Sequence, residues 1–353
     1  MSKETGFEIV ECSGTPFEMG RQYGSQCRDS VVKSVGHLVA GINARTPASE
    51  QEILATAGKY LPIVEQFDPE QIEFLRGQAE GAGLSFEQVF ALKCWFELSI
   101  YYQFVSAFCT SFAVGGRATK DGLTIIGQNF DLTVGLTVDL VKMRHASGLE
   151  QLSLVFFGGC ELTLSSAGLA MALNVMLGPG REQRLVVPSC AVITRAMRQQ
   201  RIGDAVGVVC SSGRSILHYL FADAEGSMIG IETKPDDYNV LYPRRDFLVH
   251  ANHYLTDRLK SADGTFGLME GDSHIRVQRL RRRIEEHYGE LTPELMMEFL
   301  ADHNNYPNSI CAHFNTEMPR GETLASVIMV PAQKLAYVTR GQPCCNDYQV
   351  VSL

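Results

Sequence analysis

The sequence has no apolar run close to the roughly 18 residues that a membrane-spanning helix needs. Its first residues, "MSKETGFEIV", also lack the apolar core of a secretory signal. Both absences favour a cytoplasmic protein that has no membrane partner.

An excess of positive charge is missing as well. The formal net charge is -9 and the pI is about 5.5. The densest basic run, "RLRRRIEEH", is followed at once by Glu285 and Glu286, and at helical spacing Arg282 reaches Glu286. This run is typical of a solvated, salt-bridged helix face, and we expect no nucleic-acid partner.

The ten cysteines lack the short, regular spacings of a disulfide framework or a CxxC metal site. Most are therefore expected to be reduced core residues. His250 and His253 flank Asn252, but no acidic third ligand or HExxH pattern accompanies them. We expect no metal and no dissociable cofactor, and the neighbouring Cys344 and Cys345 are interpreted as ordinary strand-end thiols.

The 353 residues, 45% of them hydrophobic, are enough for a substantial core. After a short strand in 6–14, the chain up to residue 108 has mostly helical patterns. Asp68 before Pro69 indicates one helix start, and Ser85 with Gln88 forms a capping box at another.

From residue 109 onward strand patterns dominate. We expect strands in 109–116, 123–132, 149–159 and 162–175, with Asp121-Gly122 as a hairpin turn. Helices are expected in 190–209, where Asp204 caps the second of two, and in 274–303. A meander in 215–243 and a hairpin in 323–339 complete an α+β layered architecture in one compact body.

Cys109 lies at the boundary between the helix-rich and strand-rich parts. A lone cysteine at a strand start is most often a buried apolar residue. If the chain were cut before Cys109, however, the thiol would gain a free α-amine on the same residue. The reference pKa values are near 8.5 for the thiol and about 7.7 to 8.0 for the amine, so transferring the proton costs only about 1 kcal/mol. The residue would then be nucleophile and base together.

The segment "FCTSFAVGGRATKDGLTIIGQNFDL" resembles the processing-site region of the isopenicillin N acyltransferase family (acyl-coenzyme A:6-aminopenicillanic acid acyltransferases), which are cysteine N-terminal-nucleophile (Ntn) hydrolases. Further blocks resemble that family in the same order along nearly the whole chain: "GTPFEMGRQYGSQ", "FLRGQAEGAG", "LVHANHYL", "DHNNYPNSICAH" and "PRGETLASVIM". The resemblance implies a four-layer αββα sandwich.

The resemblance also implies site residues. Cys109 would be the nucleophile released by autocatalytic cleavage of the Phe108–Cys109 bond, leaving a helical pro-part, 1–108, associated with a catalytic chain, 109–353. Asp131 matches an aspartate that holds the nucleophile, Asn252 an oxyanion donor and Arg320 an active-site arginine. Asn174 would add a polar contact, as in choloylglycine hydrolases. Taken singly, Asp131 also fits a turn former, Asn174 a strand residue and Arg320 a surface residue.

Two residues depart from the penicillin enzyme. Phe108 stands where that enzyme has glycine, and Pro319 replaces a serine before the arginine. The sequence thus favours a self-processing cysteine amidohydrolase or acyltransferase that acts on a linear amide of a small N-acyl compound through an acyl-thioester. An acyl-CoA-dependent N-acyltransferase is an alternative, and so is an uncut, non-catalytic binding or assembly protein. The expected partner is a small-molecule amide or acyl substrate, with a homo-oligomer left open.

Overall fold

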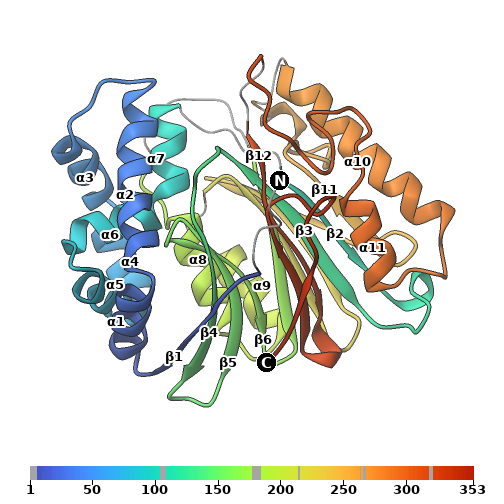
Figure 1. Cartoon of the computed structure of the whole chain (residues 1–353), viewed down its shortest axis with the longest axis horizontal. Helices are drawn as coiled ribbons and strands as arrows, with labels where there is room; N and C mark the ends of the chain where they lie inside the picture. The colour runs from blue at the N-terminus through green and yellow to red at the C-terminus, as the bar shows by residue number, and fades with distance from the viewer. Residues whose placement is uncertain are drawn as a thin grey trace.

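The computed structural model describes residues 6–103, 109–176, 184–213, 215–262, 264, 268–317 and 321–353. These residues form two β-sheets that face each other, with helices on both outer faces (Figure 1). No helix among them is both long and apolar enough to cross a membrane. The expected α+β fold with four layers in the order αββα is confirmed.

The first sheet has eight strands in the described part of the chain. Their spatial order is β1 (Ile9–Gly14), β4 (Val138–His145), β5 (Glu150–Phe156), β6 (Cys160–Ser165), β7 (Leu169–Val175), β8 (Leu217–Asp223), β9 (Met228–Lys234) and β10 (Asp237–Leu241). Strand β1 runs parallel to β4, whereas the other neighbours are antiparallel. The N-terminal part of the chain therefore supplies an edge strand of this sheet.

The second sheet has six strands among the described residues. Their order is β11 (Phe247–His250), β2 (Thr110–Val114), β3 (Ile125–Leu132), β12 (Glu322–Val330), β13 (Leu335–Arg340) and β14 (Gln349–Ser352). Strands β2 and β3 lie inside the sheet and are buried along their whole length. They contact β7 and β8 of the first sheet across the interior.

One layer of helices covers the outer face of the first sheet, and another covers the outer face of the second. The first contains α1 (Pro16–Gln26), α2 (Arg28–Asn43), α3 (Glu50–Gly58), α4 (Leu61–Phe67), α5 (Pro69–Ala82), α6 (Phe86–Lys93), α7 (Trp95–Tyr102), α8 (Ser189–Met197) and α9 (Ile202–Ser211). The second contains α10 (Leu268–Glu286) and α11 (Pro293–Leu300), drawn in orange in Figure 1. Helix α8 contacts β6 and β7, while α11 contacts β3 and β12.

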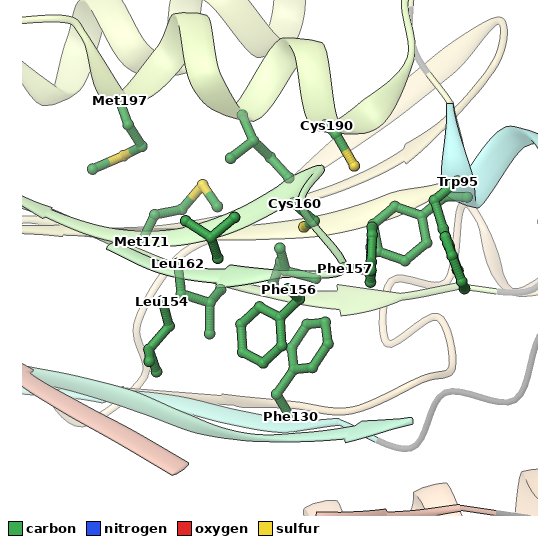
Figure 2. Close-up of a cluster of buried hydrophobic side chains, with 14 of the residues drawn as sticks. Trp95, Phe130, Leu154, Phe156, Phe157, Cys160, Leu162, Met171, Cys190 and Met197 are labelled. Atoms are coloured by element: carbon green, nitrogen blue, oxygen red, sulfur yellow. The ribbon is translucent and has the colours of Figure 1, made fainter. Parts of the chain in front are cut away.

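Apolar side chains fill the space between the sheets. Figure 2 shows Phe130 reaching from β3 toward Phe156 of β5, and the two rings stack with centroids 3.5 Å apart. On the far side of the first sheet, Trp95 of α7 stacks on Phe157 at 4.4 Å. This packing holds β3 firmly, and β3 ends at the site described below.

Helices α1 and α5 approach so closely that only glycine fits at their contact. A Cβ atom on Gly20 would lie 1.9 Å from the carbonyl oxygen of Phe74, and one on Gly77 would lie 2.0 Å from that of Phe17. Gly24 and Gly81 are equally restricted. Gly20 and Gly24 of "GTPFEMGRQYGSQ" and Gly77 and Gly81 of "FLRGQAEGAG" thus allow the two helices to pack closely.

Several helix starts follow the sequence prediction. The Asp68 side chain accepts a hydrogen bond from the Gln71 amide at the start of α5, and Ser85 forms the capping box of α6. The prediction for Asp204 was wrong. The N-cap of α9 is Arg201, which has no side-chain cap, and Asp204 instead pairs with the Arg201 guanidinium at 2.8 Å. The helix begins at Ile202, so Asp204 lies inside the first turn and not at the N-cap position.

Candidate active site

Cys109 immediately precedes β2, an inner strand of the second sheet, and its side chain has no exposed surface. The Sγ atom lies 3.9 Å from the carbonyl oxygen of Asp131 on the neighbouring strand β3. Burial raises the pKa of the Cys109 thiol, and the Asp131 carboxyl raises it further. Both effects favour the neutral thiol over the thiolate.

The carbonyl oxygen of Cys109 accepts two side-chain hydrogen bonds. The Asn174 amide nitrogen, from β7 of the opposite sheet, donates to it at 3.0 Å. The guanidinium of Arg276, from α10 in the outer layer, donates at 2.9 Å and also donates to the Thr110 hydroxyl at 2.7 Å. Three layers of the fold therefore meet at the backbone of this one residue.

Asn252 is the second residue after β11 and is fixed on both ends of its amide. Its nitrogen donates to the Val175 carbonyl at 2.8 Å, and its oxygen accepts from Arg276 at 3.0 Å. The Ser273 hydroxyl accepts the Asn252 backbone N–H at 2.9 Å. The amide nitrogen carries a second N–H, whose direction these contacts fix.

Asp131 is the penultimate residue of β3 and is completely buried. The Thr323 hydroxyl of β12 donates to its Oδ1 at 2.7 Å, and among the described residues Oδ2 has no hydrogen-bond partner. Burial raises the pKa of the Asp131 carboxyl from 3.8 to about 7, although Arg276 and the Thr323 hydrogen bond act in the opposite direction. A buried acceptor is thus available beside the nucleophile.

A buried polar chain leads away from Asn174. Its oxygen accepts from the Ser111 hydroxyl at 2.6 Å and lies 3.0 Å from Nδ1 of His218. The His218 ring stacks on His250 with centroids 3.5 Å apart, and His250 Nε2 lies 2.8 Å from a carboxylate oxygen of Glu232. Burial lowers the pKa of His218 well below its usual value, with a further contribution from His250.

The structure therefore brings together four of the residues singled out by the sequence, namely Cys109, Asp131, Asn174 and Asn252. Each is at most 3% exposed. Phe108 and Arg320, together with Pro319, lie outside the described residues.

Sequence reasoning missed Arg276, which connects Cys109 to Asn252. The arginine is 1% exposed, and burial lowers its pKa, although the charges of Asp131 and Cys109 oppose this. The sequence did contain a signal that Arg276 is buried, because this residue lies at helical spacing from Leu280 and Ile284 and hence on the apolar face of α10. The opposite face of α10 is solvated and salt-bridged as predicted, since the exposed side chains of Arg282 and Glu286 lie 3.7 Å apart.

His250 and His253, considered as metal ligands, point to different partners. Both His250 nitrogens are engaged, one by Glu232 and one near the Ala251 carbonyl oxygen at 2.7 Å. His253 Nδ1 lies 2.7 Å from the Ser273 hydroxyl. They form a buried polar cluster beside Asn252.

A family profile matches residues 117–344, described as acyl-coenzyme A:6-aminopenicillanic acid acyl-transferase. The chain belongs to this family of acyl-transferring enzymes. The matched range contains Asp131, Asn174, Asn252 and Arg276 but begins after Cys109.

Among curated proteins, the chain is similar to the 40 kDa form of acyl-coenzyme A:6-aminopenicillanic-acid-acyltransferase of Emericella nidulans. The two are 23% identical over 349 residues, which cover 95% of this chain and 92% of that protein. This relative, unlike the family profile, aligns over nearly the whole chain.

Two solved structures show a weaker likeness. A mutant of the conjugated bile acid hydrolase from Clostridium perfringens has a TM-score of 0.42 at 12% identity, covering 69% of this chain and 97% of its own. Penicillin V acylase from Agrobacterium tumefaciens has a TM-score of 0.45 at 14% identity, covering 66% and 83%.

Proposed function

We propose that the chain is a self-processing cysteine amidohydrolase whose nucleophile is Cys109. The observation that carries the proposal is the arrangement around this residue. Side chains from two other layers, Asn174 of the first sheet and Arg276 of the outer helices, converge on its backbone, and a buried aspartate with one oxygen available lies beside its thiol. Any buried backbone carbonyl needs such partners, but a cysteine that served only as an apolar core residue would not need a buried carboxyl beside its thiol.

Maturation would cut the Phe108–Cys109 bond and divide the chain into 1–108 and 109–353. The Cys109 thiol attacks the Phe108 carbonyl carbon, the Cys109 nitrogen leaves with a proton as the new α-amine, and water hydrolyses the thioester. The buried Oδ2 of Asp131 would then accept a hydrogen bond from the amine. Before the cut, the Cys109 nitrogen is a non-basic amide, so the precursor lacks the base that the mature reaction needs.

Turnover would use the same residue. The thiolate of Cys109 attacks the amide carbonyl of the substrate, and the second N–H of Asn252 stabilises the oxyanion. The protonated α-amine gives its proton to the departing amine, and water releases the acid from the thioester. Arg276 positions Asn252 and the start of β2, while Asn174 holds the Cys109 carbonyl. Arg320 is assigned to the site by family resemblance alone.

We favour hydrolysis of a small N-acyl amine or amino-acid amide over transfer to an acceptor. Transfer requires a site that binds an amine and excludes water, whereas hydrolysis requires neither. The family and its relative from Emericella nidulans carry the name of an acyltransferase. An acyl-CoA-dependent N-acyltransferase, in which the same thioester passes its acyl group to an acceptor amine, is therefore the alternative.

The deciding experiment is denaturing electrophoresis of the purified full chain with N-terminal sequencing of each band. We expect a piece that begins at Cys109, mixed with uncut chain because Phe108 replaces a strain-tolerant glycine. Cys109→Ala should stay intact and inactive, while Cys109→Ser should cleave slowly. Cys210→Ala, away from the site, is the matched control.

A chain that never yields a Cys109 N-terminus after long incubation would instead support an uncut binding or assembly protein. In cleaved preparations, an amide substrate supplied with and without a competing amine separates the two reactions. We expect mainly the free acid of the acyl group. If the amide formed with the added amine is the main product at millimolar amine, the transferase alternative is favoured.

A further inference from the structure

Four side chains that the proposed reaction does not use gather near the start of β12, at the same end of the second sheet as Asp131. His303, Cys311 and His313 come from the segment between α11 and β12, and Cys344 comes from the turn after β13. Their ligand atoms all lie within 4.8 Å of one another. Two imidazoles and two thiols are a frequent ligand set of structural zinc.

The separations fit a common centre. His313 Nε2 lies 3.0 Å from Nε2 of His303, 3.6 Å from Sγ of Cys311 and 3.4 Å from Sγ of Cys344. Zinc binds nitrogen at about 2.0 to 2.1 Å and sulfur at about 2.3 Å, so a tetrahedral shell places ligand atoms about 3.3 to 3.8 Å apart. Only small side-chain shifts separate the observed cluster from that geometry.

We propose that His303, Cys311, His313 and Cys344 bind one zinc ion that fastens the segment before β12 to the turn after β13. The set contains no carboxylate, which disfavours calcium and magnesium, and soft sulfur with imidazole favours zinc. Four protein ligands complete a tetrahedral shell and leave no open position for a substrate, so the ion is structural. Binding releases both thiol protons to solvent.

The cluster is accessible from one side and anchored on the other. Cys311 is buried and its amide donates to the Asp302 carbonyl at 3.0 Å, whereas His303 and Cys344 are exposed. Residues 301–317 contain neither a helix nor a strand. An ion can therefore enter from solvent and stabilise a segment that has little regular hydrogen bonding.

The zinc site would also support the candidate active site. Ala312, between two of the ligands, accepts from the Thr323 amide and donates its own N–H to the Thr323 hydroxyl, both at 3.0 Å. That hydroxyl donates to Asp131 at 2.7 Å. The thioester reaction itself requires no metal, so the ion acts by holding this backbone in place.

The test is the metal content of the purified full chain, kept reduced, supplied with zinc and passed over a chelating resin. We expect about one zinc per chain. His303→Ala and Cys344→Ser, both at exposed ligands, should each lose most of it. The matched controls are Cys345→Ser, which changes the adjacent exposed thiol outside the cluster, and His287→Ala, at the residue that follows α10.

Two further readouts separate a zinc site from other uses of the thiols. Cobalt in place of zinc should give a sulfur-to-cobalt charge-transfer absorption, about halved by Cys344→Ser and unchanged by Cys345→Ser. Removing the zinc with a strong chelator should lower the melting temperature of the parent and not of His303→Ala.

The proposal is overturned if the reduced chain retains less than about a tenth of an equivalent of zinc, or if Cys345→Ser loses as much metal as Cys344→Ser. A Cys311–Cys344 disulfide in intact-mass spectra of native protein, combined with no zinc binding after reduction, would overturn it in favour of a covalent link. None of these outcomes depends on whether the Phe108–Cys109 bond is cut.

Discussion

The direction of the Asn252 amide is set by two contacts, because its nitrogen donates to Val175 and its oxygen accepts from Arg276. A donor that is held in place before reaction costs no reorganisation when the oxyanion forms. We therefore expect Asn252→Ala to lower kcat by a factor on the order of 10² to 10³ with the fold unchanged. Steady-state kinetics on cleaved protein measures it.

Asn252→Asp should be at least as damaging, since it places an anion against the developing anion. Asn239→Ala, on the edge strand β10, is the control and should leave kcat unchanged. If both changes at Asn252 keep activity within a few-fold of the parent, this residue has no part in the mechanism.

Asp131 gives a prediction about pH. Because burial raises its pKa to about 7, the folded chain holds the proton more tightly than the unfolded chain does. The stability that this proton contributes is complete below the unfolded pKa, near 4, and is lost as the pH rises through about 7. The loss is on the order of a few kcal/mol.

In uncut Cys109→Ala, the melting temperature should therefore fall as the pH rises across this window. Adding Asp131→Asn should make this decrease in melting temperature smaller, because an amide does not ionise in this pH range. Thermal unfolding by circular dichroism at several pH values compares the two slopes, and the difference isolates Asp131 from other buried groups. Equal slopes would mean that Asp131 titrates with an ordinary pKa.

At the scale of elements, the contact between α1 and α5 depends on glycines, which have no side chain to separate the two backbones. Gly77→Ala would place a methyl group 2.0 Å from a backbone oxygen, which cannot move without shifting the whole of α1. We expect a destabilisation of about 1 to 3 kcal/mol, the usual cost of overpacking. Denaturant unfolding of the uncut Cys109→Ala chain measures it.

Gly36→Ala is the matched control for this change. Gly36 lies inside α2, is exposed, and nothing lies within 4 Å of the position of an added Cβ. There alanine should stabilise the chain by about 0.5 to 1 kcal/mol. If the two variants have the same free energy of unfolding, the close contact between α1 and α5 is contradicted.

Local signals predicted most elements, because caps and turns depend on neighbours in sequence. Thr292 before Pro293 does cap α11, accepting the Leu295 amide. The Asp121-Gly122 turn lies between β2 and β3 as expected, although a 3-10 turn at Gly116–Ala118 lengthens the connection. Strand β4 was not predicted, although one of its two partners, β5, follows it directly in sequence; the other, β1, comes from the start of the chain.

At the scale of the whole molecule, the site could be predicted only where family resemblance supplied long-range information. Cys109 and Asp131 lie close to the two ends of a predicted hairpin, but only the resemblance singled out Asp131. Arg276 and Thr323 reach the site from α10 and β12, and no spacing in the sequence connects them to it. The same holds for Cys344 and His303, which belong to separate segments.

The distance in sequence between Asp131 and Thr323 has a consequence for timing. The hydroxyl that holds Asp131 belongs to a residue 192 positions later, on a strand inserted between β3 and β13. During synthesis, β2 and β3 leave the ribosome long before β12 does, and until then Cys109 lacks its complete surroundings. By that time β1 already has β4 available as a partner. Under the proposed function, the Phe108–Cys109 bond would therefore be cut only after β12 has been synthesised and has joined the second sheet. Cleavage would then follow folding instead of competing with it.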